Sequence, residues 1–275
     1  MFAINGKEIA ERILADISAR PRPDKFMGAA LTGDDPASLN FLKQKAKAAA
    51  DLGIDFRLYQ LSPDLSGDEL RRQIGKLAGA KACGGFLVQL PLPEGVNPHY
   101  VLNAIPKNKD VDLLSEGALG AFYTGRHDLL PPSVATVKEL LSFRELDLRK
   151  LDVVLLGAGF LVGKPVGFWL ENKVAALTVI DSRSPQLRSR LKEADVVVSG
   201  AGVPNLITPG DLKDGALVID FGWNRVDGKI MGDFNPSAGL GTSPATPDVT
   251  YTPTPGGTGP ILVAKLFENF YALNR

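Results

Sequence analysis

The chain has 275 residues, which is enough for two domains that each bury a core. Its 31 basic and 31 acidic side chains cancel, so no overall charge favours nucleic acid or an anionic membrane. No apolar stretch reaches the roughly 20 residues that cross a bilayer. One cysteine, Cys83, and two histidines, His99 and His127, give no basis for a disulfide within the chain or for a metal site, so we expect no metal. The first seven residues lack a signal-peptide pattern, which favours a cytoplasmic protein.

In the first half of the chain the hydrophobic pattern alternates between helix and strand. Ile9, Ile13 and Ile17 share one face of a helix expected from about Lys7 to Ala19. The elements expected next are a strand over Phe26–Leu31, a turn at Gly33–Pro36, an alanine-rich helix from Ser38 through Ala50, a strand over Phe56–Leu61, a capping box at Ser66–Glu69 with a helix over Leu70–Leu77, and a strand over Gly84–Leu90.

The second half continues this alternation. The expected elements are a helix over Val134–Leu141 after Pro131-Pro132, strands over Val153–Leu156, Leu177–Ile180, Val196–Val198 and Leu217–Phe221, and a last helix over roughly Pro260–Leu273. Strands that alternate with helices predict an α/β fold with a doubly wound parallel sheet. We expect a Rossmann-like dinucleotide-binding domain over 131–253. The last helix is expected to pack back, so the N-terminal α/β domain would comprise 1–130 plus 254–275.

A glycine-rich turn follows the apolar run Leu151–Leu156 and reads Gly157-Ala158-Gly159-Phe160-Leu161-Val162-Gly163. A strand that leads through such a turn into a helix brings backbone N–H groups to a pyrophosphate. Gly157 allows the tight turn, Gly159 removes a Cβ from the path of the phosphate, and Gly163 allows close packing of helix and strand. The spacing is one residue longer than usual, so a turn that binds nothing is the alternative. The cofactor-binding candidates here are Gly157, Gly159, Val162 and Gly163.

The next predicted strand ends in a carboxylate, Asp181, 24 residues after Gly157. An acid at this place normally bonds the ribose hydroxyls of NAD and repels the 2′-phosphate of NADP. Ser182 and Arg183 follow directly, and an arginine can pair with that phosphate. These three residues complete the predicted cofactor site. They leave NADP and NAD both open.

Three polar residues of the first half are candidates for chemistry. Lys45 lies four residues after Phe41 on one helix face and could act as a general acid or base if its pKa is lowered, although a solvated lysine is the alternative. Gln89, within an apolar run, is either a hydrogen-bonding core residue or a site residue at a strand end. Asp110 and Asp112 could each accept two N–H bonds from an amino-pyrimidinone edge, although a charged surface loop is the alternative.

A loop rich in glycine and proline, Pro253–Pro260, comes before the last helix. It reads as a fixed loop whose Pro260 prepares the first turn of the helix. The alternative is that this loop serves only as a structural connection.

With these residues assembled, the chain resembles the bifunctional methylenetetrahydrofolate dehydrogenase/methenyltetrahydrofolate cyclohydrolase family. The stretches that carry the resemblance are Asn5-Gly6-Lys7-Glu8-Ile9-Ala10, Gly33-Asp34-Asp35-Pro36-Ala37-Ser38, Val88-Gln89-Leu90-Pro91-Leu92-Pro93, Lys109-Asp110-Val111-Asp112, Gly157 through Pro165, Asp220-Phe221-Gly222-Trp223-Asn224 and Pro255-Gly256-Gly257-Thr258-Gly259-Pro260. Each stretch alone is modestly specific for this family, whereas the occurrence of all of them in this order along one chain is highly specific.

The resemblance implies two activities in one-carbon metabolism, which supplies purine biosynthesis. These are oxidation of methylenetetrahydrofolate with a nicotinamide cofactor and hydrolysis of the methenyl product. It also implies an active site in the cleft between the two domains, a homodimer, and NADP as the usual cofactor, so we favour NADP over NAD.

The same resemblance assigns roles to residues of this chain. Lys45 is expected to be catalytic, Gln89 to tune it, and Asp112 to anchor the pterin ring. Phe41, Pro255, Gly256 and Gly257 are expected to bind substrate.

Several residues depart from the family pattern. Phe41 replaces a tyrosine and keeps an aromatic face but loses a hydroxyl, so we expect a weakened cyclohydrolase step. Leu113 stands in place of a glycine, which would allow the pterin loop another backbone path. Pro131–Val134, Gly159 and Ile261-Leu262 also differ from the usual residues. Two alternatives remain: a nicotinamide dehydrogenase of another small substrate on the same architecture, and a non-catalytic paralogue.

Overall fold

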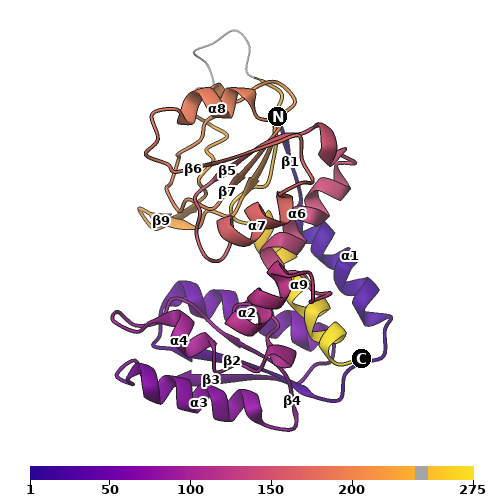
Figure 1. Cartoon of the computed structure of the whole chain (residues 1–275), viewed down its shortest axis with the longest axis vertical. Helices are drawn as coiled ribbons and strands as arrows, with labels where there is room; N and C mark the ends of the chain where they lie inside the picture. Colours follow the sequence, from indigo (N-terminus) through magenta and orange to yellow (C-terminus); the bar gives the residue numbers. More distant parts are fainter. Residues whose placement is uncertain (239–246) are drawn as a thin grey trace. The chain divides into compact units, whose positions relative to one another are not determined.

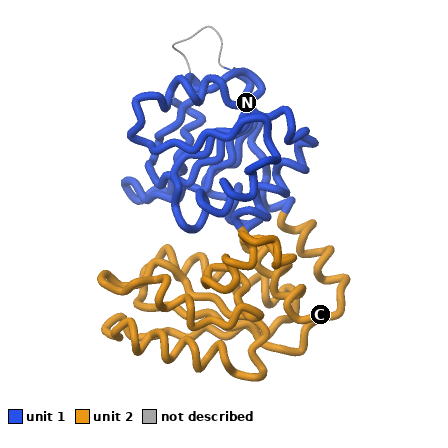
Figure 2. Tube along the Cα trace, viewed as in Figure 1, with its two compact units in different colours: residues 1–9, 133–262 blue, residues 10–132, 263–275 orange. Residues whose placement is uncertain are grey.

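The computed structural model describes residues 1–238 and 247–275, which form two compact units (Figure 1, Figure 2). Unit 1 comprises residues 1–9 and 133–262, and unit 2 comprises residues 10–132 and 263–275. Each unit contains a parallel sheet of its own, as expected for a two-domain α/β fold.

Unit 2 is built on three parallel strands in the order β3-β2-β4. Every residue of the central strand β2 is buried, as is every residue of β4, because helices follow these strands and shield the sheet. The elements of this part of the chain are α1 (Gly6–Ser18), β2 (Phe26–Thr32), α2 (Pro36–Asp51), β3 (Phe56–Leu61), α3 (Gly67–Gly79), β4 (Cys83–Val88), α4 (Pro98–Leu102), the 3₁₀ turn η1 (Lys107–Lys109) and α5 (Glu116–Tyr123).

Unit 1 contains six described parallel strands in the order β1-β11-β8-β7-β5-β6. From β5 the chain passes to β6 on one side and then returns to β7 on the other. The point at which strand order reverses therefore lies between β5 and β7. The elements are β1 (Phe2–Ala3), α6 (Pro132–Phe143), η2 (Leu148–Lys150), β5 (Asp152–Leu156), α7 (Gly163–Leu170), β6 (Ala176–Ile180), α8 (Leu187–Glu193), β7 (Val196–Ser199), η3 (Pro209–Asp211), β8 (Leu217–Asp220), β9 (Asn224–Val226), β10 (Lys229–Met231), β11 (Thr250–Tyr251) and α9 (Thr258–Leu273).

The division into units differs from the predicted one at two places. Residues 1–9 belong with unit 1 because β1 adds to the edge of its sheet, pairing Phe2 with Thr250 and Ala3 with Tyr251. Residues 254–262 also belong with unit 1, since the side chain of Thr258 donates to the carbonyl of Asp220 at 2.8 Å. These two boundaries fall within α1 and α9, and the third, between Pro132 and Ser133, falls at the start of α6.

The helices and strands predicted from the sequence are present, with shifted ends. The capping box is confirmed, since Ser66 and Glu69 make both of its bonds ahead of α3. Strand β4 ends at Val88, so Gln89 lies just beyond it, and α9 begins at Thr258 rather than Pro260. None of the described helices is long and apolar enough to span a membrane.

Candidate functional site

A buried lysine lies at the centre of the candidate site in unit 2. Asp35 caps α2 by accepting from the backbone N–H of Ser38 at 2.7 Å, and this fixes the start of the helix. Lys45 then falls one turn after Phe41, with its Nζ 4.8 Å from the centre of the Phe41 ring. The lysine is 5% exposed, so the solvated alternative is wrong. Its ammonium donates to Oε1 of Gln89 at 3.1 Å.

Gln89 is oriented by two further bonds. Its backbone N–H donates to the carbonyl of Ala30 at 2.8 Å, which extends the β2–β4 ladder by one bond beyond Val88. Its side-chain Nε2 donates to the carbonyl of Leu90 at 3.0 Å. Because the amide nitrogen is held in this way, the amide oxygen faces Lys45. Gln89 therefore lies at a strand end and holds the lysine.

The charge on this lysine is disfavoured. Burial lowers the pKa of Lys45, and the nearby carboxylate of Asp112 opposes that effect. Burial also raises the pKa of Asp112 to about 6, with Lys45 acting to lower it and Asp110 to raise it. A lysine whose pKa is lowered in this way loses its proton more readily than an exposed one, and it can then accept a proton during a reaction.

The two aspartates of this loop have different surroundings. Asp110 is fully buried, and its Oδ2 accepts from the backbone N–H of Ser115 at 2.7 Å, which fixes the loop ahead of α5. Asp112 is half-buried and interacts electrostatically with Lys45. This arrangement favours Asp112 as the ligand-binding carboxylate and gives Asp110 a structural role.

Leu113, next to Asp112, has a φ of 56°, which lies in the left-handed region that favours glycine. The side chain is fully buried. The leucine therefore adopts a glycine-type backbone here and adds core volume.

Because of this conformation, we expect a glycine variant at position 113 to be more stable than an alanine variant. Replacing Leu113 with alanine should lower the free energy of unfolding by about 3 kcal/mol, through lost burial and a cavity. Replacing it with glycine should cost about 1 kcal/mol less than alanine, because glycine relieves the left-handed strain. Urea denaturation of the two variants checks this. An alanine variant more stable than the glycine variant would contradict it.

The glycine-rich loop of unit 1 lies at the carboxyl end of β5, beside the point where strand order reverses. Gly157 has a φ of 84°, and a Cβ on Gly163 would overlap the carbonyl of Gly157, so both positions require glycine. A Cβ on Gly159 would meet nothing within 4 Å, which leaves open space over the loop. Val162 stands at the N-cap of α7 without a side-chain cap. In the first turn of α7 the N–H of Lys164 already donates to the carbonyl of Gly159 at 2.9 Å, and Pro165 has no N–H. The helix dipole and the open space over the loop, rather than a set of free N–H groups, therefore fit a pyrophosphate.

Ser133 supports this loop and was not among the predicted site residues. Its hydroxyl, on the first turn of α6, donates to the carbonyl of Leu161 at 2.7 Å. The serine is buried. In the sequence it was visible only as a departure from the family pattern.

Asp181, Ser182 and Arg183 form a turn after β6 in which Asp181 and Arg183 are exposed and Ser182 is half-buried. The guanidinium of Arg183 donates to both oxygens of Asp181, at 2.7 and 3.1 Å, and its backbone N–H donates at 2.9 Å. These bonds lower the pKa of Asp181 to about 2. The carboxylate is therefore ionised and already paired with a cation.

The predicted fixed loop over Pro253–Pro260 lies in unit 1, not in the N-terminal domain to which residues 254–275 were assigned. Gly256 has a φ of 104°, and its carbonyl accepts from the N–H of Gly6 at 3.0 Å. A Cβ on Gly257 would lie 2.6 Å from the carbonyl oxygen of Pro253. The predicted substrate-binding residues Pro255, Gly256 and Gly257 thus belong to unit 1, whereas Phe41 belongs to unit 2.

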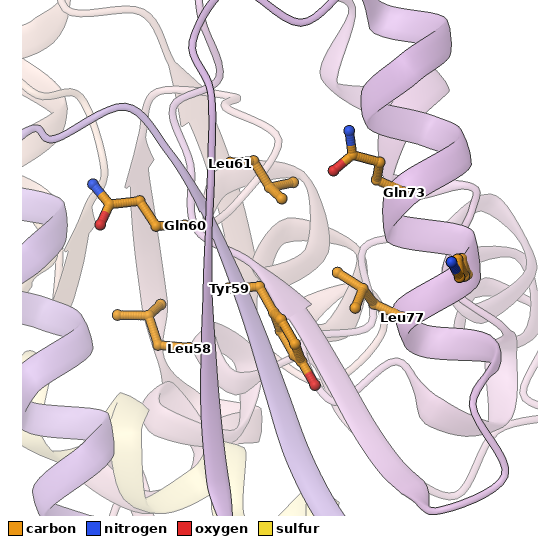
Figure 3. Close-up of a pocket in the computed structure, with 7 residues that line it drawn as sticks. Leu58, Tyr59, Gln60, Leu61, Gln73 and Leu77 are labelled. Carbon is orange, nitrogen blue, oxygen red and sulfur yellow. The ribbon is translucent and has the colours of Figure 1, made fainter.

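A separate surface pocket lies between β3 and α3 (Figure 3). It is lined by Leu58, Tyr59, Gln60, Leu61, Gln73, Lys76 and Leu77. None of the predicted site residues lines this pocket, so it does not bear on the chemistry of Lys45. Within residues 1–238 and 247–275, no group of three or more His, Cys, Asp or Glu side chains could hold a metal ion.

Comparison with known proteins gives matches over nearly the whole chain. Residues 4–112 match the catalytic domain of the tetrahydrofolate dehydrogenase/cyclohydrolase family, and residues 131–275 match its NAD(P)-binding domain. A bifunctional protein FolD from Sulfurihydrogenibium sp. is 34% identical over 98% of this chain and 96% of its own length.

Solved structures agree with these matches. The bifunctional FolD dehydrogenase/cyclohydrolase of Campylobacter jejuni is 31% identical, with a TM-score of 0.88, and the match covers 98% of this chain and 97% of the other. The FolD of Trypanosoma brucei, solved with NADP and an inhibitor, is 28% identical, with a TM-score of 0.89 and coverage of 98% and 96%. The chain described here therefore belongs to the tetrahydrofolate dehydrogenase/cyclohydrolase family.

Proposed function

We propose that this protein oxidises methylenetetrahydrofolate to methenyltetrahydrofolate with a nicotinamide cofactor and hydrolyses the methenyl product to formyltetrahydrofolate. The observation that carries the proposal is the buried amine of Lys45, held by Gln89 within the part of the chain that matches the family's catalytic domain. A lysine with a lowered pKa suits hydrolysis of a cationic substrate.

In the hydrolytic step, water adds to the methenyl bridge carbon and gives a proton to the neutral amine of Lys45. The hydroxyl of the adduct then loses its proton to water as one carbon–nitrogen bond of the bridge breaks, so the carbon remains as a formyl group. The released nitrogen takes up the proton held by Lys45, and one proton is released overall. The positive charge of the substrate also disfavours a protonated lysine. Gln89 keeps the amine in place through its amide oxygen, 3.1 Å away.

In the oxidation step, the chain has to bind and orient its ligands. The nicotinamide cofactor supplies the hydride acceptor. Gly157, Gly159, Val162 and Gly163 would hold its pyrophosphate, because they combine open space with the uncapped start of α7. Phe41 and Asp112 would hold the folate, through ring stacking and through the amino-pyrimidinone edge, and Pro255, Gly256 and Gly257 would border it.

The cofactor is proposed to be NADP. Arg183 already neutralises Asp181, which weakens the repulsion that a free carboxylate would exert on a 2′-phosphate. The exposed guanidinium has donors left for that phosphate, and Ser182 lies beside it. Family membership also supports a homodimer, and we place the protein in the cytoplasm.

Calorimetric titration with a folate analogue tests the proposal against its two alternatives. Saturable binding of one analogue per chain is expected, and it should weaken in an Asp112→Asn variant. A dehydrogenase of another small substrate would not bind the analogue. A non-catalytic paralogue would bind without turning over methylenetetrahydrofolate.

Replacing Phe41 with tyrosine should raise the rate of hydrolysis several-fold. The added hydroxyl restores a polar contact near Lys45, and one hydrogen bond contributes about 1 kcal/mol. Both steps should be measured in the purified protein and in the variant, with the dehydrogenase rate serving as the internal control. An unchanged hydrolysis rate would show that the missing hydroxyl does not limit this step.

A further inference from the structure

A buried carboxylate outside the predicted site organises a loop at the carboxyl end of β7. Asp233 is fully buried, just after β10. Its Oδ2 accepts from the hydroxyl of Ser199 at 2.6 Å and from the N–H groups of Ala201 and Gly202 at 3.0 and 3.2 Å. Its Oδ1 accepts from the N–H of Val203 at 2.9 Å and from Nδ2 of Asn224 at 3.3 Å. Three successive backbone N–H groups thus converge on one side chain.

The loop that Asp233 holds forms one wall of the proposed cofactor site. Gly157 faces this loop, because a Cβ there would lie 3.1 Å from the carbonyl oxygen of Gly200 and 3.3 Å from Cα of Ala201. A Cβ on Gly200 would lie 3.1 Å from the Cβ of Val162. Because β7 and β5 are neighbours, the two loops meet where strand order reverses, which is where ligands bind in open α/β sheets.

Two glycines leave the space that the carboxylates of Asp233 and Asp220 fill. A Cβ on Gly222 would overlap its carboxylate, and a Cβ on Gly232 would overlap that of Asp220. Asp220 in turn accepts from the N–H groups of Gly222 and Phe234 at 2.7 and 2.9 Å. Burial, together with the charge of Asp233, raises the pKa of Asp220 to about 7, so a proton on Asp220 partly relieves repulsion between the two groups.

From this geometry we infer that Asp233 is a positioning residue for cofactor binding, which acts by fixing the loop over residues 199–203 against the glycine-rich loop. The N–H groups of Gly202 and Val203 donate to the carboxylate, while these two residues are themselves solvent-exposed. The inference rests on the proposed function, because it assumes that a nicotinamide dinucleotide binds beside Gly157.

The test is an Asp233→Asn variant. Asparagine replaces one accepting oxygen with a donor that would face N–H groups of the loop, so part of this loop is released. We expect the KM and the Kd for NADP to rise about tenfold or more. Hydrolysis of added methenyltetrahydrofolate needs no dinucleotide and should stay within about twofold of wild type. If Asp233 only stabilised the fold, NADP binding and hydrolysis would be weakened together.

Asp195→Asn is the matched control. Asp195 precedes the same strand, β7, at its opposite end, where it accepts from the N–H of Asp152 at 2.8 Å and pairs with Lys213 at 2.6 Å. The control variant should lose stability and keep its Kd for NADP. If the Asp233 variant does not fold, Ser199→Ala removes one of the five donors and should raise the Kd about threefold.

The outcomes separate the two proposals. A wild-type protein that binds neither NADP nor NAD would overturn both the proposed function and the inference. A wild-type protein that binds NADP, together with an Asp233→Asn variant of unchanged Kd, would overturn the inference alone. If that variant does not fold, an unchanged Kd in the Ser199 variant would do the same.

Discussion

Replacing Lys45 with glutamine is expected to lower the rate of methenyltetrahydrofolate hydrolysis by about 100-fold or more, because a positioned general base contributes a factor of this size. Glutamine can still bond to Gln89, so the helix and the strand end should keep their arrangement. The dehydrogenase step relies on orientation rather than on this amine, and it should fall by less than about tenfold. Both rates are measured on the same preparation by absorbance.

Lys43→Gln is the matched control for this variant. Lys43 lies on the same helix and is exposed, so its replacement should change either rate by less than about twofold. Equal losses of both activities in the Lys45 variant would contradict a role in hydrolysis. Such losses would indicate instead that the lysine binds the substrate.

Replacing Arg183 with alanine is expected to reverse the cofactor preference. Loss of the guanidinium removes the partner of the 2′-phosphate and leaves the carboxylate of Asp181 unpaired, so kcat/KM with NADP should fall about 10- to 100-fold. The same unpaired carboxylate can accept bonds from ribose hydroxyls, so kcat/KM with NAD should not fall. Steady-state kinetics with both cofactors measure the change.

A second arginine of unit 1 provides the control. Arg190 lies on α8, where it pairs with Glu193 at 3.3 Å, and its replacement by alanine should affect neither cofactor. A wild-type protein that prefers NAD strongly would contradict the proposed choice of NADP. An Arg183 variant that retains its NADP kinetics would show that this side chain does not recognise the phosphate.

The elements of the fold could be predicted because their signals are local. Alternating apolar runs give the strands, and the capping box at Ser66 and Glu69 marks the start of α3. The division into units could not be predicted in full, because β1 has two residues and becomes a strand only by pairing with β11. The hairpin of β9 and β10 was missed, although Asp227-Gly228 between them is a recognised turn signal.

The candidate site was predictable to a different extent in each unit. Helical spacing places Phe41 and Lys45 together, and a strand end accounts for the position of Gln89. Their bond joins residues 44 positions apart, which no local pattern reveals. The role of Asp233 depends on donors more than 20 residues away, contributed by the end of β7, so the sequence shows it only as one acidic residue beside a glycine.

The most direct test of the central claim is the time course of methenyl absorbance after the purified protein is mixed with methylenetetrahydrofolate and NADP or NAD. We expect the absorbance to rise, with the faster rise in NADP, and then to decay to formyltetrahydrofolate through the enzyme's own hydrolysis. In the Lys45→Gln variant the rise should remain and the enzymatic decay should disappear. A wild-type protein that forms no methenyl product with either cofactor would contradict the account.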